Sequence, residues 1–129
     1  MSPPGLTLEV VTPDGLVLRE TGVDVVVLRR TEQRFAVGSE VAIFPRHGPL
    51  LVGLAVAPIR FERGPDTVHL AVDAGFGEVL EDRVTILTPR CEPVSPAARQ
   101  PGAQAEARCR EWRADRLALP PALRFPHLR

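Results

Sequence analysis

The residues able to carry chemistry are few and widely spaced. The three histidines, His47, His69 and His127, lie in three different settings, and none forms an HxH or HExxH pattern that would hold a metal. No GxSxG, GxGxxG or P-loop sequence is present, so hydrolytic and nucleotide-binding sites lack their usual glycine-rich frames. Cys91 and Cys109 form no CxxC pair, which predicts two free thiols. These residue types argue against an enzyme and against a metal or cofactor site.

One enzymatic alternative is His47 acting with Glu40 or Asp73 in general acid–base chemistry. No positioned nucleophile accompanies these residues, so this alternative ranks last. The adjacent acids Glu81 and Asp82 occupy a predicted hairpin turn, where a solvated tip is the simpler interpretation.

Charge and hydropathy bear on two classes of partner. With sixteen basic and sixteen acidic residues the formal net charge is zero, so the positive field that recruits nucleic acid is missing. No run approaches the roughly 20 apolar residues that span a bilayer. We therefore expect a soluble chain with no nucleic-acid partner and no direct membrane insertion.

The elements that must position these residues are short strands. From residue 6 to 88, segments rich in Val, Ile, Leu and Thr alternate with turn residues about every 8–12 positions, which is typical of an all-β sandwich or barrel, and we expect a sandwich. The strands predicted are LTLEVV, GLVLRE, VDVVVLR, VAIF, LLVGLAV, IRFE, TVHLAV and VTILT, with turn signals at 13–15, 22, 38–39, 63–66 and 81–82. In TVHLAV, alternation places Thr67, His69 and Ala71 on the solvent side. The run VVVL at 25–28 does not alternate, which predicts a strand covered on both faces or lying at a contact.

The character of the chain changes at residue 91. The prolines of CEPVSPAARQPGAQ predict an irregular linker. Between residues 103 and 119, Ala105, Cys109 and Trp112 recur at helical spacing with Leu119, amid charged residues, which predicts one amphipathic helix. Packing on its own sandwich and binding a partner are equally open for this helix.

The stretch IFPRHGPLL at 43–51 has the composition of a rigid display loop. Pro45 and Pro49 fix φ at two points and Gly48 lets the chain turn sharply, so Arg46 and His47 would stand on a stiff platform. A stiff loop favours binding because it loses little conformational entropy when a partner binds. One hypothesis is therefore a stand-alone β-sandwich module that binds a ligand or peptide through this platform.

Three segments, in their order along the chain, carry a family resemblance. LTLEVVTPDGLVL resembles a first hairpin that begins L-x-V-V-T-P, GSEVAIFPRHGPLLVGL resembles the signature G-x-x-G-[IVL]-x-P-G-H-x-P-L-L, and VHLAVDAGFGEVLEDRVTILT resembles a strand pair ending in GG-x-x-E-V-x-x-x-x-V-T-I-L. All three are features of the epsilon subunit of F-type ATP synthases. The resemblance implies a ten-stranded antiparallel β-sandwich of two five-stranded sheets, followed by a short, Pro-rich C-terminal segment with one helix. We accordingly place the sandwich domain at 1–90, and a linker with a degenerate helical segment at 91–129.

The resemblance also implies a function. Members are non-catalytic subunits of the rotor's central stalk that link the gamma subunit to the membrane c ring and couple ion translocation to ATP synthesis or hydrolysis. They carry no cofactor for chemistry, and the implied location is the cytoplasmic face of the bacterial inner membrane, as a peripheral part of the ATP synthase complex. The c ring selects proton or sodium, so this sequence is silent on the ion.

Carried over position by position, the resemblance implies two contact surfaces. The gamma-subunit interface comprises Thr12, Arg46, His47 and Val52, and the c-ring interface comprises Gly38, Ser39 and Glu40. Arg46 stands where the family has glycine, which adds a charge to the display loop. Glu40, on the loop before VAIF, matches an acidic position that suits arginine-bearing polar loops of the ring.

The C-terminal segment departs from the family. Members usually have two antiparallel helices that can extend into the alpha/beta catalytic head and inhibit hydrolysis, and some bind ATP through [IL]-D-x-x-R-A. Residues 91–129 offer one credible helix and no such motif. We expect weakened or absent inhibition, no ATP site, and contact with the head only through this segment. A tail of this kind would suit a divergent, accessory ATPase of the N type.

Overall fold

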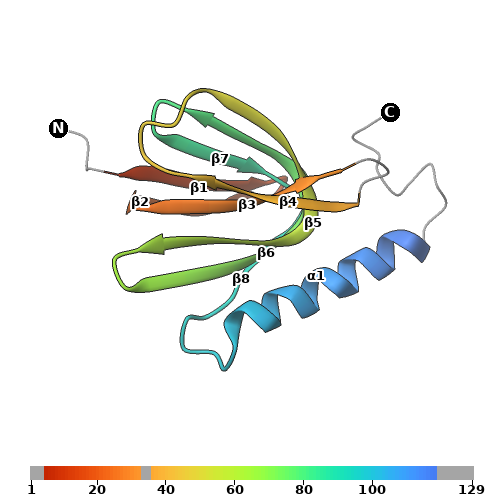
Figure 1. The fold of residues 1–129 in the computed structure, drawn as a ribbon. Coiled ribbons are helices and arrows are strands. Elements are labelled where there is room, and N and C mark those ends of the chain that lie inside the picture. Colours follow the sequence, from red (N-terminus) through yellow and green to blue (C-terminus); the bar gives the residue numbers. More distant parts are fainter. Residues whose placement is uncertain (1–4, 33–35, 119–129) are drawn as a thin grey trace.

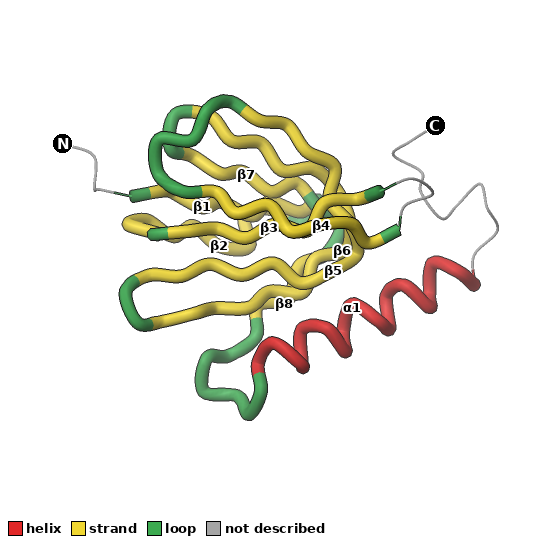
Figure 2. Tube along the Cα trace, in the orientation of Figure 1, coloured by secondary structure: helices red, strands yellow, loops and turns green. Residues whose placement is uncertain are grey.

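Eight strands and one helix make up the described residues, 5–32 and 36–118, of the computed structural model. The elements are β1 (Leu6–Thr12), β2 (Gly15–Val23), β3 (Val25–Thr31), β4 (Val37–Ile43), β5 (Leu50–Arg63), β6 (Asp66–Leu80), β7 (Arg83–Leu87), β8 (Cys91–Pro93) and α1 (Pro101–Ala118). The strands form two layers, and α1 lies along the outside of one of them (Figures 1 and 2). A mainly β, sandwich-type domain with one C-terminal helix is therefore confirmed.

The prediction of ten strands in two five-stranded sheets is wrong. β5 runs for 14 residues and β6 for 15, and both curve from one layer into the other without a break (Figure 1). LLVGLAV and IRFE are thus one strand, because β5 and β6 stay in register across Pro58, which faces Ala71. The strands form one hydrogen-bonded path, β2-β1-β7-β6-β5-β3-β4, with β8 paired to β6.

The sheet is not wholly antiparallel. β1 pairs with β7 in parallel, from Thr7 opposite Arg83 to Val11 opposite Leu87, while the other described pairs are antiparallel. The first strand is consequently an inner strand, with β2 on one side and β7 on the other.

Turn chemistry is correct for three connections and wrong at two predicted sites, because Gly22 lies near the end of β2 and is not a turn residue. The chain turns at 13–14, 64–65 and 81–82 as predicted. Gly38 and Ser39, predicted as a turn, lie inside β4, because residues 37–43 pair with β3 along their length. Val25 to Leu28 are all buried, as their lack of alternation predicts.

The main core fills the space between the two layers. Its buried members come from β1 to β7 and are Leu6, Leu8, Val10, Val23, Val26, Leu28, Ile43, Val52, Leu54, Ile59, Phe61, Leu70, Val72, Val79, Val84 and Ile86. Alternate positions of each strand supply these side chains, so the opposite positions face outward.

A second, smaller core lies beneath α1. The predicted stripe of Ala105, Cys109 and Trp112 is fully buried and packs against β5 and β6. Leu119, the last residue of that predicted stripe, lies outside the described residues. Ala71 was predicted to face solvent and is instead buried under the helix.

His69 lies near the start of the helix and is half-buried, not free in solvent. Burial and the nearby Arg60 guanidinium lower the pKa of this histidine below its ordinary value.

The description of the C-terminal segment as Pro-rich is not supported, and the irregular linker is confined to residues 94–100, between β8 and α1. Pro93 ends β8 and Pro101 begins α1, positions where a missing N–H costs no ladder or helix hydrogen bond. Among the described residues, no helix is long and apolar enough to cross a membrane.

Candidate functional site

Apolar side chains gather on the outer side of the sheet formed by β1, β2, β7 and the adjoining halves of β5 and β6. Of the exposed large hydrophobic residues among those described, five lie here, including Leu51 at 71% and Leu87 at 52% exposed. With the half-buried Val11 they define the outer apolar face: Val11, Leu16, Leu51, Phe76, Leu80 and Leu87. Surfaces of this kind on small domains mark interaction sites.

Strand register turns part of this face into a continuous row. Leu16 pairs with Val11, Val11 with Leu87, and Leu87 with Phe76, so the row crosses four strands. The next row along the strands is polar, with Glu9 held between Arg19 and Arg83 at 3.0 Å each.

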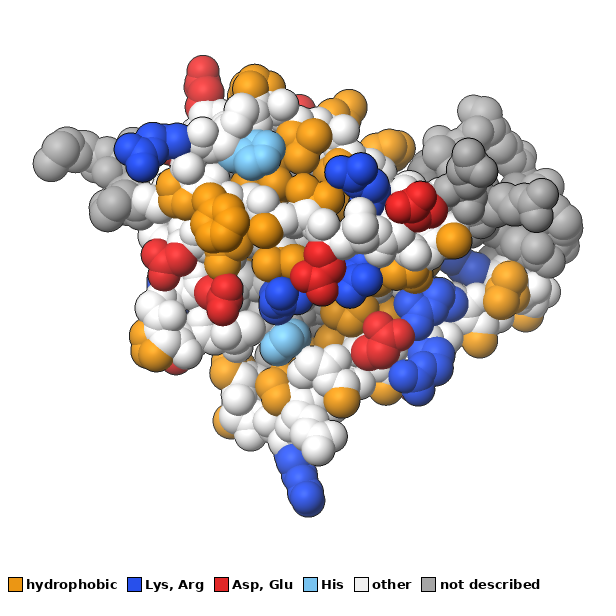
Figure 3. Space-filling model, viewed as in Figure 1, with side chains coloured by type: hydrophobic (Ala, Val, Ile, Leu, Met, Phe, Trp, Pro, Cys, Tyr) orange, Lys and Arg blue, Asp and Glu red, His pale blue; other side chains and the backbone are white. Residues whose placement is uncertain are grey.

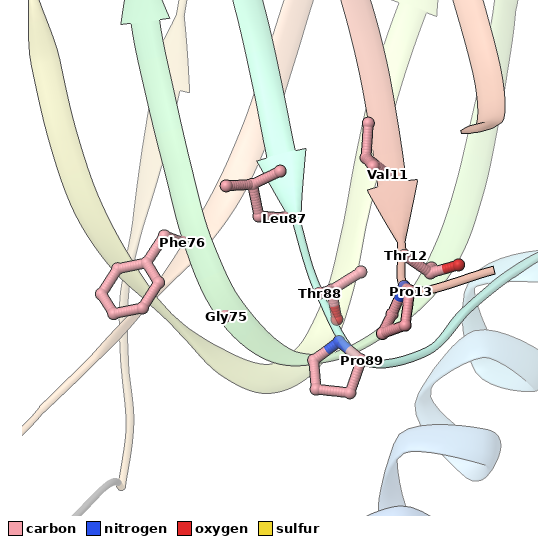
Figure 4. Close-up of a pocket in the computed structure, with 8 residues that line it drawn as sticks. All are labelled: Val11, Thr12, Pro13, Gly75, Phe76, Leu87, Thr88 and Pro89. Atoms are coloured by element: carbon pink, nitrogen blue, oxygen red, sulfur yellow. The ribbon is translucent and has the colours of Figure 1, made fainter. Parts of the chain in front are cut away.

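The apolar row ends in a groove of about 340 Å³. Its lining consists of Val11, Thr12, Pro13, Gly75, Phe76, Leu87, Thr88 and Pro89. Figure 4 shows Leu87, Thr88 and Pro89 between the Phe76 ring on one side and the residues of β1 and its turn on the other. The Thr12 hydroxyl accepts the Asp14 amide at 3.2 Å, which fixes the edge of the groove. Thr12, predicted to face the gamma subunit, is thus part of an apolar groove.

The groove floor is built from constrained backbone. Ala74 and Gly75 have φ values of 61° and 120°, and a Cβ on Gly75 would overlap the Leu87 carbonyl oxygen. The Thr88 amide donates to the Val11 carbonyl at 3.1 Å, which joins the end of β7 to β1. Only glycine fits at position 75 without moving the neighbouring strand.

The Arg46–His47 loop lies at the other end of this sheet. Arg46 has a φ of 65°, and its N–H donates to Asp82 Oδ1 at 2.6 Å. His47 Nδ1 lies 2.7 Å from the Gly48 carbonyl oxygen, to which it donates. Gly48 is not among the residues with positive φ, so the sharp turn assigned to it occurs at Arg46. Arg46 adopts the left-handed backbone conformation that glycine favours, which agrees with the glycine that the resemblance places at this position.

Val52, the remaining residue of the predicted gamma-subunit interface, is 7% exposed and belongs to the main core. The neighbouring Leu51 points the opposite way and is the residue that β5 presents on the surface. A shallow hollow of about 280 Å³ surrounds Leu51 and Leu80. The structure therefore brings Leu51, and not Val52, to the outer apolar face.

The three residues predicted to face the c ring lie on the edge strand β4 and not on a loop. Glu40 stands opposite Arg29 in the register and pairs with Arg29 at 3.1 Å and Arg60 at 3.2 Å. The Arg29 guanidinium also donates to the Gly38 carbonyl at 3.3 Å. On the face shown in Figure 3, acidic and basic side chains are interleaved. Glu40 itself is paired with two arginines and so adds no unpaired negative charge to the surface.

The structure does not assemble the enzymatic alternative. Glu40 is engaged by two arginines, and Asp73 is buried between Arg90 and Arg116. In the part of the chain that is described, no group of three or more His, Cys, Asp or Glu side chains could hold a metal ion.

Sequence reasoning missed the outward residues of the groove. Phe76 and Leu87 alternate with buried Gly77 and Ile86, a signal present in GFGEVL and VTILT. This alternation predicts that Phe76 and Leu87 are exposed once the inward face of each strand is known. It does not predict that β1 lies beside β7.

Comparison with known proteins gives a consistent result. The family model described as ATP synthase, Delta/Epsilon chain, beta-sandwich domain matches residues 5–94. The ATP synthase epsilon chain of Magnetococcus marinus is 45% identical over 83 residues, which are 64% of this chain and 56% of that protein. The epsilon chain of Halalkalibacterium halodurans is 42% identical over 89 residues, which are 69% of this chain and 62% of that protein.

A solved structure shows the same fold. A chain of the Euglena gracilis mitochondrial ATP synthase, in a cryo-EM structure of OSCP, F1 and c ring, superposes with a TM-score of 0.62 at 20% identity. The match covers 98% of this chain and 74% of that one. The aligned part spans about 60% of the length of the curated relatives. The sequence match and the β-sandwich of this chain agree, and the chain belongs to the ATP synthase delta/epsilon family.

Proposed function

We propose that this chain is a non-catalytic central-stalk subunit of an F-type ATP synthase. In this role it links the gamma subunit to the membrane c ring and couples ion translocation to ATP synthesis or hydrolysis. The support is the family match over residues 5–94 and the epsilon chains among its relatives. The chain would then lie peripherally, at the cytoplasmic face of a bacterial inner membrane, as part of the ATP synthase complex.

The observation that carries gamma binding is the outer apolar face with its groove. Thr12, a residue carried over from the family's gamma contacts, lines the groove beside Leu87 and Phe76. Arg46 and His47 lie at the opposite end of the same sheet. A partner that covers both ends would bury the apolar row at the groove together with Leu51 and Leu80 nearer the loop, and burial of such apolar surface supplies the main driving force of association.

The c-ring contact is proposed for β4. This edge strand presents Gly38, Ser39 and Glu40 on a different part of the molecule from the groove, so two partners could bind together. On binding, Glu40 would give up its ion pair with Arg29 or Arg60 and pair with basic groups of the ring. Exposed pairs of this kind contribute only about 0–1 kcal/mol, so the exchange costs little.

Binding of gamma is the decisive test. The full chain and a Leu87→Asp variant would be titrated with the isolated gamma subunit of the same organism by calorimetry. A charge in the apolar row should weaken binding by at least about tenfold. Val37→Asp, at an exposed apolar position on β4 (42% against 52% for Leu87), is the matched control and should bind as the natural chain does. No binding by the natural chain would refute the function, and unchanged binding by Leu87→Asp would refute the face.

A test of the c-ring contact uses Glu40→Gln. The variant should fold normally, because it removes only exposed ion pairs. We expect weaker binding to isolated c ring with unchanged binding to gamma. An equal loss of binding to the c ring and to gamma would show that Glu40 supports the fold and not the c-ring contact.

The C-terminal segment is proposed to have little or no inhibitory action on the alpha/beta head. Its one described helix packs Cys109 and Trp112 against Val56, Ala71 and Ala74 of its own sandwich, with Ala105 also fully buried. The ion pairs Arg108–Glu92 and Arg116–Asp73 and the cation–π contact of Arg90 with Trp112 also join the helix to the sandwich.

A further inference from the structure

The last turn of α1 is joined to the sandwich by a buried carboxylate. Asp73 on β6 accepts hydrogen bonds from Arg116 Nε at 2.8 Å and from Arg90 Nε at 2.9 Å. Arg116 also donates to the Asp73 carbonyl oxygen at 3.2 Å. The Asp73 and Arg116 side chains are only 4% and 11% exposed, so solvent screens this pair far less than a surface pair. We call Asp73, Arg90 and Arg116 the Asp73 clamp.

Arg90 belongs both to the helix contact and to the rim of the groove. Its guanidinium lies over the Trp112 ring, 4.7 Å from the centroid. Its carbonyl oxygen accepts the Asp73 amide at 3.1 Å and the Thr88 hydroxyl at 3.1 Å. Thr88 and the adjoining Pro89 line the groove. A shift of Arg90 must therefore move the groove rim and the helix contact together.

On β6, the clamp and the groove floor are also directly connected. Only Ala74, at a φ of 61°, separates Asp73 from Gly75, at a φ of 120°. Gly75 packs so closely on the Leu87 carbonyl that a Cβ would not fit between them. Tightly packed backbone of this kind transmits a displacement because it has no free space to absorb it.

We propose that the Asp73 clamp couples docking of α1 to the shape of the groove, so that the docked helix holds the groove in its partner-binding form. The proposal rests on the proposed function, in which the partner at the groove is the gamma subunit. Coupling is reciprocal, so gamma bound at the groove also stabilises the docked helix. The helix is then a support for the interface.

The coupling can be tested without any partner by hydrogen exchange on the full chain. Arg116→Ala removes the helix side of the clamp and leaves Asp73 paired with Arg90. Arg110→Ala removes an exposed arginine from the same helix and is the matched control. The amides of Asp73 and Thr88 should exchange about tenfold faster in Arg116→Ala and at the natural rate in Arg110→Ala. Faster exchange confined to α1 would overturn the proposal.

Titration with isolated gamma subunit gives the second arm. Arg116→Ala should bind about fivefold more weakly than Arg110→Ala, at the lower end of usual coupling strengths. Equal affinity of the two variants would overturn the coupling. If the natural chain does not bind gamma, the proposed function fails while the exchange experiment still decides the coupling. Should Arg116→Ala fail to fold, Arg116→Lys keeps the charge without the forked geometry and serves in both arms.

Discussion

Gly75 and Gly15 offer a matched pair of substitutions that separates backbone strain from steric overlap. Both have strongly positive φ, 120° and 117°. A Cβ on Gly15 would meet nothing within 4 Å. A Cβ on Gly75 would overlap the Leu87 carbonyl oxygen and lie 3.0 Å from the Thr88 Cα, both of them backbone atoms. Both alanine variants therefore carry the cost of an unfavourable φ, and only Gly75→Ala also carries the cost of steric overlap.

The magnitudes follow from these surroundings. An alanine held at such a φ costs on the order of 1–3 kcal/mol, and this applies to both positions. At position 75 the chain must also move β7 away from β6, and overpacking of this kind adds about 1–3 kcal/mol. We expect Gly15→Ala to lower the free energy of unfolding by about 1–3 kcal/mol and Gly75→Ala by about 2–6 kcal/mol, with Gly75→Ala losing about 1–3 kcal/mol more than Gly15→Ala.

Urea denaturation followed by circular dichroism measures both values. Because a domain of this size has a total stability of about 5–15 kcal/mol, the loss in Gly75→Ala should be plain as a large fall in the midpoint. The slope of the transition should not change, since both variants expose the same surface on unfolding. Equal losses in the two variants would show that the close approach of Gly75 to Leu87 does not constrain the groove floor.

Three further predictions concern the two cysteine thiols, the half-buried His69 and the buried Trp112. Burial raises the pKa of Cys91 to about 12 and that of Cys109 to about 11. Both thiols should therefore react slowly with a thiol reagent at mildly alkaline pH until urea unfolds the chain. Because folding raises both thiol pKa values, the two thiols contribute fully to stability below the ordinary value of 9.0 and lose that contribution as pH rises through 11–12. Urea midpoints measured across this pH range should therefore fall. Burial and the Arg60 charge lower the pKa of His69, so its contribution to folding stability is present above the ordinary value of 6.5 and declines below it. In His69→Gln this loss of stability at acid pH should disappear. Trp112 is fully buried, so Trp112→Ala should destabilise docking of α1 by about 3–5 kcal/mol, seen as faster amide exchange in α1 than in β1.

Local patterns in the sequence were enough to predict most elements of the fold. The unbroken run Val25 to Leu28 is buried throughout, and the helical stripe of Ala105, Cys109 and Trp112 packs as its spacing indicates. Each of these patterns depends on neighbours within one element, so periodicity alone reveals it. The same patterns failed at β5 and β6, where two predicted strands are one, because continuity is decided by the partner strand.

The candidate site was less predictable because it depends on contacts between distant segments. Thr12 was carried over from the family as a gamma-subunit contact and lines the groove, but the groove itself needs β1 beside β7. Val52 was assigned to the surface, and its burial follows from which face of β5 turns inward. Asp73 was considered only as a catalytic acid, since nothing local to it indicates that Arg90 and Arg116 converge there.

The parallel pairing of β1 with β7 has a consequence for how the chain is made. β1 begins at Leu6 and β7 ends at Leu87, so the first strand leaves the ribosome long before one of its two partners exists. At about 5–20 residues per second this delay lasts several seconds. Until then β1 can pair only with β2, and an isolated hairpin is marginally stable at best. For that time the apolar side chains of Leu8 and Val10 lack the core neighbours that β7 supplies, so the nascent N-terminal hairpin exposes apolar surface while the rest of the chain is made.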